Sequence, residues 1–349
     1  MAVEPQPSEL DPTTTASNAR IALKRDSRGP AGPATSIYGG FAYFQGAIVP
    51  FEDAKVSVGT HALNYGTACF EGIRGYWNPD HKEIYLLKLA EHYQRFLKST
   101  ALLKIKLDES VEQLCELTRE VVRRDGYRTD VYVRPIAYKA SPIIKVDLHS
   151  PQDDVAIFAM PMGGYSRIDG LRVTISSWRR ISDNSIPARA KITGAYINTA
   201  LAAEDANAAG YDDCLMLTED GHIAEGSAAN FFMVQGRTLV TPPVTDDILV
   251  GITRAAVMRL ALDFELDIVE RSVDRTEVYQ ADEAFLCGTG VQVAPIVEVD
   301  GRPIGSGRPG SITLGMQDAY FRAVRGNDPR YRQWCTPVYG GMPRITESR

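Results

Sequence analysis

The sequence predicts an α/β (α+β) protein with two domains, and three observations support this. The chain has 349 residues, a length at which a single hydrophobic core usually gives way to two. Segments with the periodicity of strands and of helices are mixed, without strict strand–helix–strand alternation. A glycine-containing polar stretch at 162–170, "MGGYSRIDG", fits an interdomain linker. We therefore expect a small α/β domain at 36–161 and a larger domain at 171–349.

The N-terminal 1–35 stretch is rich in Pro, Ser, Thr and Ala and has no apolar periodicity. We expect a disordered tail there. The stretch also lacks a basic region followed by an apolar run, so it is not expected to be a signal peptide.

The first domain is expected to begin with a hairpin. Gln45-Gly46 separates two apolar runs within 37–58 and predicts the turn. The segment 83–103 changes from a strand to an amphipathic helix with Leu89, Tyr93 and Phe96–Leu97 on one face. A second helix is expected at 110–124 with Ser110 as its N-cap. Strands should follow at 130–138 and 154–162.

The second domain should open with a strand at 171–178, followed by a helix from about Tyr196 to Ala209. Short strands broken by Asp-Gly and Gln-Gly turns are expected over 213–243. A helix at 251–266, a strand and loop at 283–301 and a C-terminal helix at 311–325 complete the pattern.

Composition and motifs argue against several functions. The formal net charge of −6 argues against a nucleic-acid partner, because such proteins normally show a basic face. No apolar run approaches the roughly 20 residues that span a bilayer. The five cysteines are scattered without a C-x-x-C pair, and the five histidines lack metal-ligand spacing, so we expect no bound metal. Free thiols fit a cytoplasmic location. Nucleotide-binding and hydrolase motifs are absent.

Lys191 stands out by composition. Residues 146–349 hold eighteen arginines and one lysine, whereas residues 1–145 hold ten arginines and nine lysines. A guanidinium stays protonated under ordinary conditions, but an ammonium can lose its proton and act as a nucleophile or base. One interpretation is therefore that position 191 needs an amine and not merely a positive charge. The alternative is an arginine-biased composition with one surface lysine left over.

Other segments supply possible partners for this amine. Gly251 directly precedes an expected helix that starts with Ile252 and Thr253, and the free N–H groups of a helix N-terminus favour a phosphate. Thr289 and Gly290 in "CGTG" offer further backbone donors, and Glu225 lies among small residues between strands. Each feature alone is common in proteins without such a site. Together, an amine, a phosphate cradle and a carboxylate are what a pyridoxal phosphate site requires.

The chain resembles the class IV (fold type IV) pyridoxal phosphate aminotransferases, and most closely the branched-chain amino acid aminotransferases. The class signature is matched by "EGSAANFF" (225–232), "LVT" (239–241) and "LVGITR" (249–254). Further matches are "HALNYGTACFEGIRGY" (61–76), "EHYQRF" (91–96), "VYVRPI" (131–136), "SSWRRISDNSIPARAKITGAY" (176–196) and "CGTG" (287–290). The resemblance covers about residues 38–325. It implies that the larger C-terminal domain is a pseudo-barrel.

The resemblance also implies roles for individual residues. Lys191 would form the Schiff base with pyridoxal 5′-phosphate, Tyr196 would hydrogen-bond its phenolic oxygen and Glu225 would meet its pyridine nitrogen. Leu249 would pack on the ring. The phosphate would be held by Arg95, Gly251, Ile252, Thr253 and Thr289. The substrate pocket between the domains would be lined by Tyr65, Phe70, Tyr132, Arg134, Tyr165, Thr289 and Gly290, with Arg74 matching less directly.

The activity implied is a ping-pong transfer of the amino group of Leu, Ile or Val to 2-oxoglutarate, in a homodimer or larger homo-oligomer. Arg134 would meet the distal carboxylate of glutamate. Val250 and Met162 depart from the commonest pattern, and Met162 leaves room for a broader range of amines. The alternatives are an (R)-amine or D-amino acid transaminase and an aminodeoxychorismate lyase. A non-catalytic pyridoxal phosphate-binding protein is disfavoured because Lys191 and Glu225 are both present.

Overall fold

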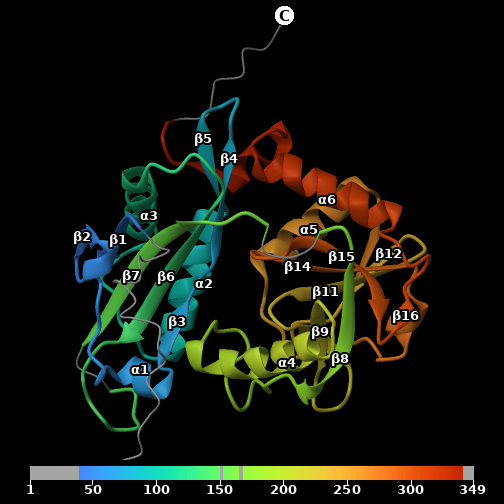
Figure 1. The fold of residues 1–349 in the computed structure, drawn as a ribbon, viewed down its shortest axis with the longest axis horizontal. Coiled ribbons are helices and arrows are strands. Elements are labelled where there is room, and N and C mark those ends of the chain that lie inside the picture. Colours follow the sequence, from blue (N-terminus) through green and yellow to red (C-terminus); the bar gives the residue numbers. More distant parts are fainter. Residues whose placement is uncertain (1–38, 150–151, 165–167, 341–349) are drawn as a thin grey trace, which may run out of the picture. The chain divides into compact units, whose positions relative to one another are not determined.

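Two β-sheets organise the chain (Figure 1). The computed structural model describes residues 39–149, 152–164 and 168–340, so the predicted 1–35 tail and Tyr165 lie outside it. The first sheet has the strand order β17-β5-β4-β6-β7-β1-β2, with β3 paired to β6. Its strands are β1 (Phe41–Phe44), β2 (Ala47–Pro50), β3 (Ala68–Phe70), β4 (Ile73–Asn78), β5 (Glu83–Leu87), β6 (Val131–Lys139), β7 (Asp153–Pro161) and β17 (Cys335–Pro337).

The predicted elements of the first sheet are confirmed. Gln45 and Gly46 join β1 to β2. Both have positive φ, which is the backbone conformation that a two-residue hairpin turn requires. Helix α2 (Leu89–Leu102) buries Leu89, Tyr93 and Phe96 on one face. Helix α3 (Val111–Asp125) begins with a capping box at Ser110. A short helix that the sequence did not predict, α1 (His61–Tyr65), precedes β3.

The second sheet closes on itself. Its order is β10-β9-β8-β15-β14-β11-β12-β13, with β16 on β15 and an additional pairing of β10 with β11. The closing contact is the antiparallel pair Glu225 and Asn230. The barrel-like sheet expected from the resemblance is thereby confirmed. Its strands are β8 (Leu171–Arg179), β9 (Asp213–Leu217), β10 (Ile223–Gly226), β11 (Asn230–Gln235), β12 (Thr238–Thr241), β13 (Asp267–Glu270), β14 (Glu283–Gly288), β15 (Gln292–Val299) and β16 (Arg302–Pro303).

Side chains of β11 alternate between two cores. Phe231 and Met233 pack in one buried cluster, whereas Phe232 and Val234 pack in another together with residues of α5 (Ile252–Asp263) and α6 (Ser311–Val324). A strand buried on both faces needs apolar residues at successive positions, which explains the run "FFMV" at 231–234. Helix α4 (Tyr196–Ala208) packs against β8 and β9. Short 3-10 helices lie at Phe51–Asp53, Thr193–Ala195, Glu277–Gln280 and Pro329–Trp334.

Backbone contacts connect the segment around Lys191 to the first sheet. Ile192 forms an isolated antiparallel bridge with Cys69 of β3, and the N–H of Phe70 donates to the carbonyl of Lys191 at 3.0 Å. Gly66 has φ +67°, and a Cβ there would lie 2.7 Å from the Cα of Gly194. These contacts place Lys191 beside the end of β3.

Two further features bear on the sequence-based expectations. The strand β17 pairs with β5, so residues 335–337 join the first sheet, a return that no pattern in the sequence predicted. The domain boundaries at 162–170 stay a prediction. Within the part of the chain that the structure describes, no helix combines the length and the apolar character needed to cross a bilayer.

Candidate active site

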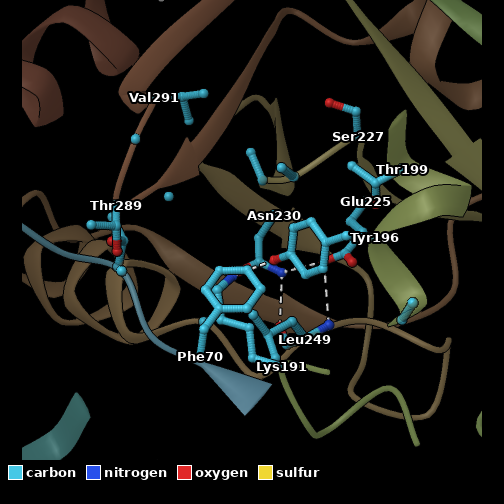
Figure 2. A pocket seen from close by; sticks show the side chains of 18 of the residues that line it. Phe70, Lys191, Tyr196, Thr199, Glu225, Ser227, Asn230, Leu249, Thr289 and Val291 are labelled. Atoms are coloured by element: carbon cyan, nitrogen blue, oxygen red, sulfur yellow. Dashed lines mark hydrogen bonds between the residues drawn. The ribbon is translucent and has the colours of Figure 1, made fainter. Parts of the chain in front are cut away.

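A cavity of about 630 Å³ brings most of the predicted site residues together (Figure 2). Its walls come from β3 and β6 of the first sheet, from β10 and the β14–β15 loop of the second sheet, and from the helices α4 and α5. The predicted residues that line it are Phe70, Arg95, Tyr132, Arg134, Lys191, Tyr196, Glu225, Leu249, Gly251, Ile252, Thr253, Thr289 and Gly290.

Lys191 presents its amine to aromatic groups. Its Nζ donates a hydrogen bond to the hydroxyl of Tyr196 and lies 5.0 Å from the ring centroid of Phe70 (Figure 2). The rings of Phe70 and Tyr196 contact each other with centroids 4.8 Å apart. Among the described residues, no carboxylate forms an ion pair with Lys191. The amine is therefore held in place by the hydroxyl of Tyr196.

Glu225 is a buried carboxylate with several partners. Its Oε1 lies 2.9 Å from Nε of Arg180, and its Oε2 accepts hydrogen bonds from Nδ2 of Asn230 (3.0 Å) and the N–H of Leu249 (3.3 Å). Burial raises the pKa of Glu225, and Arg180 is the main group opposing that rise. Arg180 and Asn230 were not singled out from the sequence, although both lie inside the matched motifs.

The N-terminus of α5 faces the same cavity. Gly251 is the N-cap residue, and Ile252 and Thr253 line the cavity. A Cβ at Gly251 would clash with Oδ1 of Asn230, so any larger residue here would displace the Asn230 side chain. Arg95 lies beside this end of the helix and donates from Nη1 to the carbonyl of Val250 at 2.8 Å. Free helix N–H groups and a guanidinium together make an anion site.

Another part of the wall combines aromatic rings with the guanidinium of Arg134. Arg134 donates from Nη2 to the hydroxyl of Tyr132 at 2.8 Å, and its guanidinium carbon lies 4.2 Å from the ring centroid of Phe70. Its Nε is buried without a hydrogen-bond partner. Among the described residues, no carboxylate pairs with Arg134. The wall can therefore accept an apolar side chain and also a carboxylate.

Two predicted lining residues take other positions. Among the residues that the structure describes, Tyr65 and Arg74 are not part of the cavity wall. The ring of Tyr65 contacts His61 at 4.7 Å between centroids. Arg74 is buried and donates from Nη2 to the carbonyl of Gly163. Met162 does line the cavity. For Tyr165, which lies outside the described residues, the lining role stays a prediction.

Comparisons with known proteins show which family the chain resembles. A family model described as amino-transferase class IV matches residues 68–299. The chain is 45% identical over 301 residues to a probable branched-chain-amino-acid aminotransferase of Aquifex aeolicus (strain VF5), covering 86% of this chain and 97% of that protein.

Solved structures of branched-chain aminotransferases are similar to the chain along most of its length. The branched-chain aminotransferase of Thermoproteus uzoniensis, solved with norvaline, is 40% identical with a TM-score of 0.83, covering 86% of this chain and 100% of the other. The branched-chain amino acid aminotransferase of Thermobaculum terrenum, solved in its PLP form, is 38% identical with a TM-score of 0.83, covering 87% of this chain and 99% of the other.

The pairing of Arg180 with Glu225 predicts a shift in a titration. In an Arg180→Met variant, the opposing charge is lost while burial remains, so the pKa of Glu225 should rise above its already raised value. Infrared spectroscopy would follow the protonated carboxyl band of the protein against pH. The band should appear at higher pH in the variant and should be missing from Glu225→Gln in either background. An unchanged midpoint would contradict the role assigned to Arg180.

Proposed function

The chain belongs to the class IV aminotransferases, and on this premise we propose that it transfers the amino group of Leu, Ile or Val to 2-oxoglutarate with pyridoxal 5′-phosphate as cofactor. One observation carries the proposal. A single cavity holds the amine of Lys191, the buried carboxylate of Glu225 and the N-terminus of α5. The curated relative and both solved structures described above carry the branched-chain name.

The residues of the cavity fit this cofactor. Arg95, Gly251, Ile252, Thr253 and Thr289 would hold its phosphate, because they combine a guanidinium with backbone donors at a helix end. Glu225 would meet the pyridine nitrogen, and Leu249 would pack on the ring. When bound, the cofactor supplies an electron sink for the bonds at the substrate's α-carbon.

The side chains around Lys191 account for proton transfer. The amine would take the proton from the α-carbon of the substrate and return it, acting as base and then as acid. Tyr196 orients the amine through its hydroxyl. The two half-reactions would follow a ping-pong order, so that a branched 2-oxo acid leaves before 2-oxoglutarate enters. Lys191→Arg would keep the charge and lose the base, because a guanidinium does not deprotonate.

An absorption experiment tests this function. The purified holoenzyme should change its visible spectrum with L-leucine alone and recover with 2-oxoglutarate, whereas Lys191→Arg should show neither change nor turnover. A spectrum that responds to D-alanine or an (R)-amine, but not to L-leucine, would refute the branched-chain assignment and leave the cofactor in place. Near-wild-type turnover by Lys191→Arg would refute the assignment of the lysine.

Arg134 should separate the two acceptor classes. Arg134→Leu removes a cation from the wall while Phe70 and Tyr132 remain, so binding of the distal carboxylate of 2-oxoglutarate should weaken. KM for 2-oxoglutarate should rise by about tenfold or more, the effect of losing a charge-assisted hydrogen bond of about 1.5–3 kcal/mol. KM for a branched 2-oxo acid should change far less. Equal rises for both acids would refute this role.

Exposed aliphatic side chains near α1 support a homodimer or larger homo-oligomer. Val58, Leu63, Ile144 and Val146 are 86%, 62%, 69% and 84% exposed. The two segments that carry them are joined, since Nε2 of His61 lies 2.8 Å from the carbonyl oxygen of Lys145. Such a patch costs free energy in water and favours association. Sedimentation should give at least a dimer, and Val146→Asp should weaken it; a wild-type monomer would contradict this.

We also propose a cytoplasmic location, where free thiols persist.

A further inference from the structure

An ion pair between Arg95 and the fully buried Glu71 lies beside the N-terminus of α5. We propose that Glu71 is a positioning residue: it aims Arg95 at the α5 N-terminus and thereby sets the affinity of the site for the phosphate group of the cofactor. The proposal rests on the proposed function, because it concerns the same cofactor. Neither the sequence motifs nor the names of the relatives assign Glu71 a role.

The contacts fix the orientation of Arg95. Glu71 is fully buried directly after β3, and its Oε1 and Oε2 accept from Nε and Nη2 of Arg95 at 2.7 and 2.8 Å. This two-point contact uses one edge of the guanidinium and fixes its plane. The remaining nitrogen, Nη1, points to the carbonyl of Val250, the residue before the helix cap Gly251.

His92 fixes Glu71 in turn. Its Nδ1 lies 2.8 Å from Oε2 of Glu71, and both side chains are buried. Burial lowers the pKa of His92 despite the nearby carboxylate, so the neutral ring donates its Nδ1–H to Glu71. Burial alone would raise the pKa of Glu71, but Arg95 and His92 outweigh it and hold the pKa below its usual range. Glu71 is therefore ionised, and its charge balances that of Arg95.

Electrostatics explains why this arrangement points to an anion. The N-terminus of a helix carries a partial positive charge, so a guanidinium placed beside it is repelled when nothing lies between them. Glu71 offsets that repulsion from behind and keeps Arg95 in place. A phosphate that binds both the Arg95 guanidinium and the helix N-terminus would be stabilised by the two positive groups together. With Nε and Nη2 held by Glu71, Nη1 is the nitrogen left on the side of the helix end, where it donates to the carbonyl of Val250.

Cofactor binding, not turnover, tests the proposal. Glu71→Gln keeps the size of the side chain and removes its charge. Titrated into the apoenzyme, pyridoxal 5′-phosphate should bind about tenfold or more weakly to the variant, the size of effect seen when outer partners of a ligand are removed. Pyridoxal, which lacks the phosphate, should bind within about twofold of wild type. Glu91→Gln, which breaks the half-exposed Lys88–Glu91 pair on the same helix, is the matched control and should change neither affinity.

A double-mutant cycle shows whether Glu71 acts through Arg95. In an Arg95→Gln background, adding Glu71→Gln should cost less than about twofold in affinity, because the group it positions is already gone. Additive losses, equal losses for pyridoxal and its phosphate, or an unchanged phosphate affinity would each refute the proposal. If Glu71→Gln does not fold, Glu71→Asp can replace it, because it keeps the charge but shortens the reach of the carboxylate. Its affinity for pyridoxal 5′-phosphate should fall by a smaller factor, and its affinity for pyridoxal should not change. Equal losses of affinity for both forms would refute the proposal. A wild-type protein that binds neither form would refute the proposed function itself.

Discussion

The site depends on burying one carboxylate where the second sheet closes. Glu225 and Asn230 form the cross-strand pair that joins β10 to β11, so the closure of the barrel and the placement of this carboxylate are the same event. An unpaired buried carboxylate is costly, and Arg180 and Asn230 offset that cost. The Asn230 amide also donates to the carbonyl of Leu249, and its oxygen lies against Gly251. One amide therefore sets the distance between Glu225 and the start of α5.

The end of β3 organises the other side of the cavity. The N–H of Phe70 donates to the chain at Lys191, its ring contacts Tyr196, and the next residue, Glu71, holds Arg95. Neighbouring residues on an extended chain point to opposite sides, so one short segment can serve the lysine on one face and the arginine on the other. Backbone hydrogen bonds and the ring contact of Phe70 with Tyr196 thus join the two sheets at this point.

Local patterns in the sequence predicted what local physics determines. The face of α2, the cap at Ser110 and the hairpin at Gln45 depend on neighbours within a few residues, and the structure confirms them. The cofactor-side residues could be proposed because motifs keep them at constrained spacing. Arg180, Glu71 and His92 were missed because their roles arise from ion pairs and hydrogen bonds formed only on folding. The return of β17 to β5 joins residues about 250 apart in the sequence, a distance over which no periodicity carries information.

The two sheets supply different parts of the cavity wall, and this determines which positions can be substituted without affecting the others. Lys191, Glu225 and the start of α5 belong to the second half, whereas Phe70, Tyr132 and Arg134 belong to β3 and β6 of the first sheet. Positions on β6 and at Met162 can therefore be varied in a directed-evolution library while the β10–α5 unit is left untouched. New amino acceptors should be sought by varying residues of the first sheet while the second sheet is left unchanged.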